Sequence, residues 1–307
     1  MRPIAFSNPG RFWRGNLHAH STRSDGILSP EEVCRRYRAE GYDFIALTDH
    51  FVGLYDYPIV DTAPMRSDDF TTILGAELHS GAMENGEIWH VLAVGLPSDF
   101  APAHAPGFMA REDQETGPAL AQRAADAGAF IAIAHPEWSG MTDADTRSIT
   151  AAHAVEVYNH SCLVDADRPH GFAALDLLLA EGRQLNLIAT DDAHFASKDA
   201  FGGWVMVKAE ANAPDALLTA LKSGAMYATT GPEIHDITLE GKTLTVHSSA
   251  AASVMVLGEG SAAQVLHGSS MTRAAITLAR VADSPWLRVV VVDAAGKRAW
   301  SNPIHRS

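Results

Sequence analysis

Short apolar runs alternate with helical patterns over the first two-thirds of the chain, and this order limits the possible folds more than any other feature. The apolar runs predict strands at 16–19, 44–48, 72–76, 90–96, 130–134, 155–158, 188–190 and 204–207. Helical patterns lie between several of them, at 118–127, 171–180 and 214–223. Strands that alternate with helices predict a mainly parallel α/β sheet covered by helices. About seven such units in about 230 residues favour a closed barrel over an open sheet.

One further helix, after the first strand, has signals at both of its ends. Ser29 is the expected N-cap, Pro30 the first helical residue, and Glu32 completes an S-x-x-E capping box. Val33 lies on the buried face of this helix, and Gly41 ends it.

The pattern changes near residues 229–233, where the letters are TTGPE. The residues that follow show no helical pattern, but they show short β runs separated by Gly, Ser and Asp. This spacing predicts a small antiparallel sandwich. We therefore expect an α/β domain over 1–230 and an all-β accessory domain over 231–307. Three roles are open for the accessory domain: it covers the barrel, mediates dimerisation or carries a substrate-facing loop. The expected runs are 237–239, 243–246, 253–257, 275–278, 287–292 and a packed return strand within 300–304.

Histidine and carboxylate side chains gather where the predicted strands of the first domain end. In a β/α barrel these ends meet at one rim, so residues far apart in sequence meet in space. Residues i and i+2 of an extended segment face the same side, which predicts that His18 and His20 face one point, as do Asp192 and His194. Imidazole nitrogen with carboxylate oxygen suits Zn, Mn or Fe. The residues are His18, His20, Asp25, Asp49, His50, Glu77, His79, His90, His135, Asp192 and His194.

The acidic composition excludes several classes of protein. Lys and Arg number 23 against 37 Asp and Glu, so the formal net charge is −14 with histidine neutral. This charge opposes broad binding to long nucleic acid or to an anionic membrane. The chain has no apolar run of about 18 residues, and its first residues lack the apolar segment of a signal peptide. Two cysteines, Cys34 and Cys162, are too few for a disulfide framework and favour the cytoplasm.

Six motifs spread over residues 14–208 resemble the PHP (polymerase and histidinol phosphatase) superfamily: GNLHAHSTRSDG, YDFIALTDH, GAELHS, HVLAVGL, AIAHP and ATDDAH. Three later segments, GWVMVKA, YATTGPEI and WSNPI, resemble its carbaryl-hydrolase-like branch. The resemblance implies a distorted (β/α)7 TIM-like barrel, a centre of two or three divalent ions (Mn, Zn or Fe) and phosphoesterase activity.

The resemblance also implies how the ligands divide among the ions. His18, His20 and Asp192 would hold one metal, and Asp25, His50 and His194 a second. His90 and His135 would hold a third, and Glu77 would bridge the first and the third. The complete set argues against an inactive member of the superfamily.

The expected reaction is in-line attack of a metal-bridging hydroxide on a small phosphorylated metabolite or nucleotide, since clustered cations neutralise the phosphoryl oxygens. Their charge also makes the pocket locally positive within an acidic protein. His194 is expected to assist leaving-group protonation if it is not fully committed to a metal. Asp49 either orients a liganding histidine or caps the end of its strand. Asp191, beside Asp192, is expected to be structural.

Five further residues are candidates for contact with the substrate. His79 follows Glu77 on the same strand face. Three roles are open for it: metal ligand, substrate contact or packing residue. Asn159 and His160 follow a strand at the expected rim, where an ordinary loop role is the alternative. Arg168 and His170 either meet a substrate phosphate or belong to a solvated charge cluster.

Two other functions compete with a phosphoesterase acting on a small anionic substrate. The first is hydrolysis of a carbamate or carboxyl ester at the same metal centre, which needs an apolar site with few donors, whereas phosphate needs Arg, Lys or backbone donors. The sequence has no cluster of Arg or Lys beside the motifs. The second is a metal-stabilised binding protein without activity. The oligomeric state stays open, with a homodimer among the options.

Overall fold

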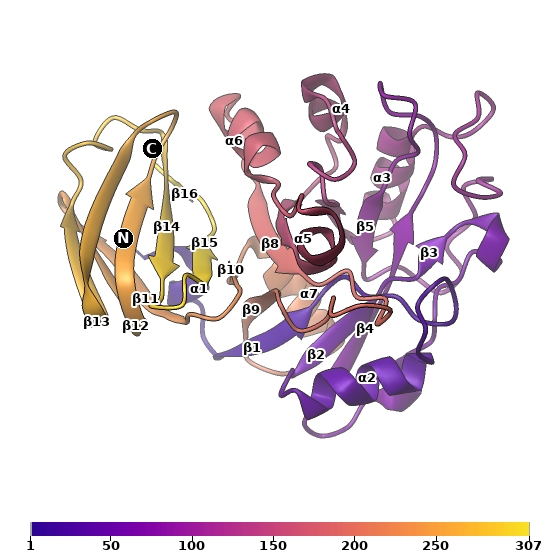
Figure 1. Cartoon of the computed structure of the whole chain (residues 1–307), viewed down its shortest axis with the longest axis horizontal. Helices are drawn as coiled ribbons and strands as arrows, with labels where there is room; N and C mark the ends of the chain where they lie inside the picture. Colours follow the sequence, from indigo (N-terminus) through magenta and orange to yellow (C-terminus); the bar gives the residue numbers. More distant parts are fainter. Residues whose placement is uncertain (1, 307) are drawn as a thin grey trace.

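The computed structural model describes residues 2–306 (Figure 1). Its helices are α1 (Ile4–Ser7), α2 (Pro30–Ala39), α3 (Gly117–Asp126), α4 (Asp143–Ser148), α5 (His160–Ala166), α6 (Phe172–Ala180) and α7 (Pro214–Ser223), with 3-10 turns η1 (Gly53–Tyr55) and η2 (Ala63–Met65). The first strands are β1 (Arg11–Asn16), β2 (Phe44–Leu47), β3 (His50–Phe51), β4 (Thr71–Leu78), β5 (Val91–Val94), β6 (Phe130–Ile133), β7 (Ala154–Asn159), β8 (Asn186–Thr190), β9 (Trp204–Ala209) and β10 (Met226–Thr229). The later strands are β11 (Ile234–Glu240), β12 (Thr243–Leu257), β13 (Ala263–Thr277), β14 (Trp286–Val292), β15 (Arg298–Ser301) and β16 (Ile304–His305).

The sheet of the first region is mixed rather than uniformly parallel, although the pair β3–β4 and several others in it are parallel, as the sequence predicts. The hydrogen-bonded path of the whole sheet runs β11-β12-β14-β15-β10-β9-β1-β2-β4-β5-β6-β7-β8. The pairs β1–β2, β2–β4, β6–β7 and β7–β8 are parallel, while β4–β5, β5–β6, β1–β9 and β9–β10 are antiparallel. No helix lies between β4 and β5. Without a crossover helix the chain reverses direction, and the two strands pair antiparallel.

The ladder of strands does not close within residues 2–306, since β8 lies at one end of the path. The segments that follow β1 and β8 meet instead at one parallel bridge between Ala19 and Ala193. The N–H of His20 donates to the carbonyl of Ala193, and the N–H of Asp192 donates to that of His18, both at 2.9 Å. A complete (β/α)7 barrel therefore stays a prediction, but the bridge places the H-x-H and D-x-H segments side by side.

The C-terminal region is built from antiparallel strands, as its sequence predicts, and lies at the left of Figure 1. The two runs expected at 243–246 and 253–257 belong to one long strand, β12, whose register with β13 shifts between them. Strand β15 pairs with β14 on one side and with β10 on the other. The sheet thus continues from the first region into the second, and the boundary at residue 230 stays a prediction.

Local signals explain which helices the sequence predicts. Ser29 accepts the N–H of Glu32 at 3.3 Å, as expected for the N-cap of α2. In a complete capping box the Glu32 carboxylate would also accept the N–H of Ser29. This part of the prediction is wrong, because that carboxylate accepts from Arg35 and Arg36 instead. Helices α3, α6 and α7 lie within one residue of their predicted positions. The short helices α4 and α5 were not predicted, since neither spans two full turns.

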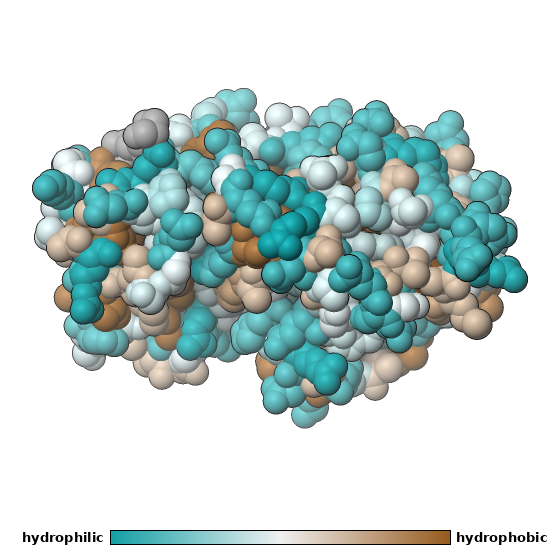
Figure 2. Space-filling view, turned by 90° about the horizontal axis from the view of Figure 1, so that it is seen from above, coloured by the Kyte–Doolittle hydropathy of each residue, from teal (hydrophilic) through white to brown (hydrophobic). Residues whose placement is uncertain are grey.

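The two faces of a strand carry different side chains, and this alternation determines which side chains reach the functional site. In β7, Val155 and Val157 point into an apolar cluster, while the carboxylate of Glu156 is buried on the opposite face. Among the described residues no helix has the length and apolar character needed to span a bilayer. The face seen from above is mainly hydrophilic, with small apolar patches (Figure 2).

Candidate metal centre

A cavity of about 540 Å³ lies where the ends of several strands converge. Imidazole and carboxylate groups, together with two aromatic rings, form much of its wall. Its lining includes Asp25, His50, Glu77, His90, Phe108, His135, Trp138, Asp192 and His194. The structure therefore brings together side chains that the sequence places at separate strand ends.

One set of donors joins the segments after β1 and β8. The Nε2 atoms of His18 and His20 lie 3.1 and 2.9 Å from the same oxygen, Oδ1 of Asp192. The donor atoms of these three buried residues lie within 4.8 Å of one another. His18 and His20 thus face one point, as their i, i+2 spacing predicts.

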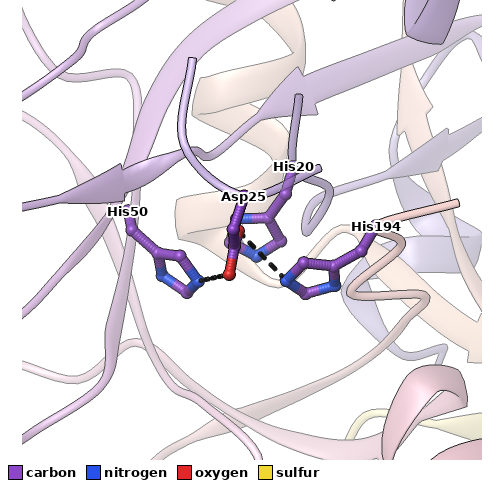
Figure 3. Close-up of side chains that lie close together, drawn as sticks. All are labelled: His20, Asp25, His50 and His194. Atoms are coloured by element: carbon purple, nitrogen blue, oxygen red, sulfur yellow. Dashed lines mark ion pairs between the residues drawn. The ribbon is translucent and has the colours of Figure 1, made fainter. Parts of the chain in front are cut away.

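A second set surrounds Asp25 (Figure 3). Oδ2 of Asp25 lies 3.3 Å from Nε2 of His50, and Oδ1 lies 3.4 Å from Nε2 of His194 and 3.9 Å from Nδ1 of His20. His194 therefore belongs to this set and Asp192 to the first, so the prediction that both face one point is wrong. The reason is that Asp192 has a φ of 57°, which turns the chain out of an extended conformation.

Glu77 lies at the centre of the cluster and is buried. Its Oε1 is 2.8 Å from Nδ1 of His90 and 3.1 Å from Nε2 of His135, and its Oε2 is 2.7 Å from Nδ1 of His50. Glu77 forms one candidate set with His18 and His135 and another with His50 and His79. This carboxylate therefore touches donors from several strands, as a bridging ligand must.

His79 and His90 differ from their expected positions. His79 belongs to a set of donor atoms with His50 and Glu77, and its Nε2 lies 2.9 Å from Nδ1 of His50. His90 contacts Glu77 but belongs to none of the sets of three or more donors among the described residues. The geometry therefore favours His79 as a ligand more strongly than the sequence did.

The chemistry of the donors fits divalent cations. Nε2 of His18, Nδ1 of His20 and Oε2 of Glu77 are buried and, although other donor atoms lie close to them, they make no hydrogen bond of regular geometry among the described residues. Buried polar atoms are costly unless something pairs with them. The second nitrogen of His18 donates to Glu156 at 2.9 Å and that of His79 to the carbonyl of Trp89 at 3.1 Å. These bonds fix the tautomer that leaves Nε2 free to bind a metal.

In the metal-free cluster, burial and neighbouring charges move the histidine pKa values in opposite directions. Burial opposes the charged form of His50 and His194, but the carboxylates around them outweigh it and raise their pKa values to about 10 and about 9. Burial and neighbouring histidines lower the pKa of His20 and of His79 to about 3. The facing histidines hold the pKa of Glu77, despite its burial, well below the usual range.

Glu156 is a site residue that sequence reasoning missed. It is fully buried and accepts hydrogen bonds from Nδ1 of His18, from the N–H of His135 at 2.7 Å and from Thr190. It therefore orients two of the proposed ligands. The signal that could have revealed it is a carboxylate between two valines of an apolar strand, where an unpaired charge would be too costly to bury.

Two proposed ligands adopt left-handed backbone conformations. His135 has a φ of 23° and Asp192 a φ of 57°. Such conformations cost of the order of 1–3 kcal/mol in a non-glycine residue and are often found at functional sites. Asp192 is held by the hydrogen bond to the carbonyl of His18, and His135 by the one to Glu156.

Asp49 and Asp191 shape the backbone rather than the cavity. The Asp49 carboxylate accepts from the N–H and hydroxyl of Ser21 and from the hydroxyl of Ser24. It anchors the loop that carries Asp25, and its hydrogen-bond partners among the described residues include no liganding histidine, so the structure does not support the first of its two expected roles. Asp191 accepts from the Tyr37 hydroxyl at 2.7 Å and from the N–H groups of 201–203. Its expected structural role is confirmed.

The remaining candidates lie at different distances from the cluster. Asn159 is buried and donates through Nδ2 to Glu156 and Asp192, which places it behind the ligands. Arg168 lines a cavity of about 400 Å³ together with His90 and Trp138. His160 and His170 line a different cavity, which excludes the proposed metal ligands.

Both cysteines are free and buried. Cys162 lies in the wall of the metal cavity. Burial and the nearby carboxylates raise the pKa of its thiol far above the usual range. The thiol therefore stays protonated and is a poor nucleophile.

Comparison with known proteins gives one matching family model and several similar structures. The PHP domain model matches residues 16–187. A two-domain protein from Bacteroides vulgatus ATCC 8482, which contains a predicted PHP-like metal-dependent phosphoesterase, is 17% identical, with a TM-score of 0.54 and 98% of each chain covered. At this identity the similarity concerns the fold alone.

Two other relatives match smaller shares of this chain. An amidohydrolase from Chromobacterium violaceum, with bound sulfate and no metal, has a TM-score of 0.45 at 16% identity over 60% of this chain and 89% of its own. A 5'-3' exoribonuclease from Haemophilus influenzae (strain ATCC 51907 / DSM 11121 / KW20 / Rd) is 54% identical over 35 residues, which are 11% of this chain. The match spans only 13% of that relative's length.

Proposed function

This chain belongs to the PHP domain family and is a hydrolase, and from that premise we propose that it is a metal-dependent phosphoesterase for a small phosphorylated compound. The observation that carries the proposal is the group of overlapping donor sets around Glu77 and Asp192. Two histidine nitrogens of this group, Nε2 of His18 and Nδ1 of His20, are buried without a hydrogen-bond partner among the described residues, whereas buried polar atoms are normally paired.

We assign two or three divalent ions (Mn, Zn or Fe) to these sets. His18, His20 and Asp192 would hold one ion, and Asp25 with His50 a second. Glu77 would share its oxygens between these and a third, held with His135 and with His79 or His90. Such ions neutralise phosphoryl oxygens and lower the pKa of bound water.

His194 would move a proton to the leaving oxygen in this proposal. Its Nδ1–H donates to the carbonyl of Asp192 at 2.8 Å, which directs Nε2 toward the cavity. Its side chain is 24% exposed, whereas that of His50 is 9% exposed. Without His194 the second ion would still have Asp25 and His50. The site can therefore leave His194 free for general acid catalysis.

Aromatic rings at the mouth of the cavity indicate a substrate with a planar group. Phe108 and Trp138 are 36% and 44% exposed. The Phe108 ring centre lies 4.9 Å from that of His50, and the Trp138 ring centre lies 4.9 Å from that of His135. Stacking surfaces beside the reactive centre favour a nucleotide or an aryl phosphate over an aliphatic one.

The same observation favours a second candidate function, hydrolysis of an aryl carbamate or carboxyl ester. Arg168 is the one arginine or lysine among the residues that line the metal cavity and its neighbour. Few cations and two exposed rings are expected of a site for an uncharged aromatic ester. We place it second because the donor sets suit several clustered ions, which a phosphate needs most.

One experiment distinguishes these functions. The purified chain is reconstituted with Mn or Zn, its bound metal is counted, and the same sample is assayed with an aryl phosphomonoester, a phosphodiester, a short oligonucleotide and an aryl carbamate. We expect at least two ions per chain and turnover of a phosphate ester. Turnover of the carbamate alone would support the second candidate. Metal binding without any turnover would support the third option, a metal-stabilised binding protein.

Matched variants connect the activity to the proposed centre. His18→Ala and Asp192→Ala should each abolish turnover while the far-ultraviolet circular dichroism spectrum stays native. His235→Ala, an exposed histidine that pairs only with Glu233 among the described side chains, is the control and should keep full activity. Near-normal turnover by either ligand variant would remove that residue from the centre.

We also propose the cytoplasm as the compartment, because both cysteines are free. The substrate partner is a small anion rather than long nucleic acid or a membrane, given the net charge of −14. A homodimer stays one option for the assembly, and light scattering of the purified chain tests it.

A further inference from the structure

A second cavity, of about 850 Å³, lies between the helices beside the metal cavity and the C-terminal strands. Its lining includes Phe172 of α6 and, from β14, Arg288 and Val290. Figure 1 shows where α6 and β14 lie in the fold. The residues that line it include none of the proposed metal ligands. It is therefore a separate site, and the proposed hydrolysis does not use it.

Helix α5 separates the two cavities. His160 and Leu163 line the second cavity, whereas Ser161, Cys162 and Asp165 line the metal cavity. The two cavities thus share a helix but no lining residue. A ligand in one does not need to displace a ligand in the other.

One part of the second cavity is aromatic. The ring centres of Tyr158 and Phe172 lie 6.1 and 5.7 Å from that of Trp300. Met255 and Leu257 add aliphatic surface from β12. Such a wall suits the face of a planar apolar group.

The other part of the cavity is positive, which is unusual in a protein of net charge −14. Its lining includes Arg288, Lys297 and Arg298, and no Asp or Glu. Arg288 is 4% exposed and pairs with Asp176 at 2.8 Å through Nη1, but its buried Nε has no hydrogen-bond partner among the described residues. Lys297 has no ion pair within the described part of the chain. These cations therefore have charge and hydrogen bonds available for an anion.

We propose that this cavity binds a small organic anion with a planar aromatic body. The ring group packs against Phe172 and Trp300. The anionic group faces Lys297, in the exposed turn before β15, and Arg298, the exposed first residue of β15. Arg288, whose guanidinium carbon lies 4.7 Å from the Phe172 ring centre, adds a cation beside the same aromatic surface. Charge complementarity selects an anion over a neutral or cationic aromatic compound.

The test uses the full chain and the aryl sulfonate 1-anilinonaphthalene-8-sulfonate as the probe. Fluorescence and calorimetric titrations should show saturable binding of one probe per chain, with and without a metal chelator. The neutral analogue N-phenyl-1-naphthylamine should bind about tenfold more weakly, because it lacks the anionic group. Absence of saturable binding, or competition by inorganic phosphate only in the metal-loaded enzyme, would overturn the proposal.

Variants locate the bound probe. Lys297→Glu/Arg298→Glu reverses two exposed charges at the cavity and should weaken binding by about tenfold or more. Lys242→Glu/Arg273→Glu is the matched control, with the same change of charge on exposed positions of the C-terminal region outside this cavity. Met255→Trp fills the cavity without changing the charge and should also reduce binding. Equal weakening in the control and the charge-reversal variant, or unchanged affinity in Met255→Trp, would contradict this site.

Discussion

At the scale of single residues, the buried carboxylate of Glu156 orients two of the proposed metal ligands, although it is not proposed as a ligand itself. Its two oxygens accept from His18, the backbone of His135, Asn159 and Thr190. Carboxylates behind a metal-bound histidine fix its tautomer and increase its basicity. The sequence could not separate Glu156 from an ordinary strand residue, because its partners come from three other strands or loops.

Glu156→Gln keeps the shape of the side chain but removes its charge, so we expect metal affinity to fall by about 10–100-fold. The amide also turns one acceptor oxygen into a donor, which opposes the N–H of His135 or of His18. Metal dissociation constants measured by competition with a chelating dye provide the test. Glu181→Gln, at an exposed carboxylate that pairs with Arg147, is the control and should leave the affinity unchanged. Unchanged affinity in Glu156→Gln would show that Glu156 only fills space.

The metal-free histidines also predict how metal binding depends on pH. Among the proposed ligands, the surrounding carboxylates outweigh burial and raise the pKa of His50 to about 10, and they also raise the pKa values of His18 and His135, so these histidines favour the doubly protonated form when no metal is bound. A histidine must lose that proton to become a ligand. Metal binding should therefore release protons, and the apparent affinity should rise as the pH increases from 6 toward 9.

Calorimetry in buffers of different ionisation enthalpy measures this proton release directly. We expect at least one proton to be released per metal-loaded chain near pH 7. His50→Gln should reduce the number, while His235→Ala should not. An affinity that falls as the pH increases over this range would contradict the expected sign.

At the scale of elements, the sequence predicts long strands and helices better than short ones. Capping signals at Ser29 and the period of the apolar residues predict the positions of α2, α3 and α7 to within about two residues. Helix α5 has too few residues for a helical period to be visible, and its N-cap, Asn159, is the last residue of β7. The direction of β5 was equally hidden, because it depends on a connection without a helix.

Asn159 couples α5 to the candidate metal centre. Its Oδ1 accepts the N–H of Cys162 at 2.9 Å, and its Nδ2 donates to Asp192 at 3.1 Å. Asn159→Asp keeps a good N-cap but loses the donor and adds a negative charge beside two carboxylates. Asn159→Ala loses both functions.

We therefore expect the two variants to differ. Asn159→Ala should lose about 1 kcal/mol of unfolding free energy from the cap alone. Both variants should reduce turnover, because Asp192 loses its hydrogen bond. Urea unfolding and kcat measured on the same samples separate the two effects. Full activity in Asn159→Asp would show that only the cap matters at this position.

At the scale of the whole molecule, the arrangement of the strands determines which distant residues meet. Strand order and direction are not visible in a single sequence, so the sequence predicted the ligand types but divided them only partly as the structure does. His79 joined a donor set and Asp49 did not. The bridge between Ala19 and Ala193, which brings the first and last ligand segments together, also depends on the complete fold.

Because the ligands come from segments between residues 18 and 194, metal binding should stabilise most of the chain rather than one loop. A ligand that binds only the folded state at 100 times its dissociation constant adds about 2.7 kcal/mol at one site. For a chain of this size that is expected to raise the Tm by roughly 5 °C or more. Differential scanning calorimetry of the chelated and reloaded protein measures the shift. His18→Ala should abolish most of it, whereas His235→Ala should keep it. An equal shift in His18→Ala would mean that the stabilising metal binds outside the donor sets described above.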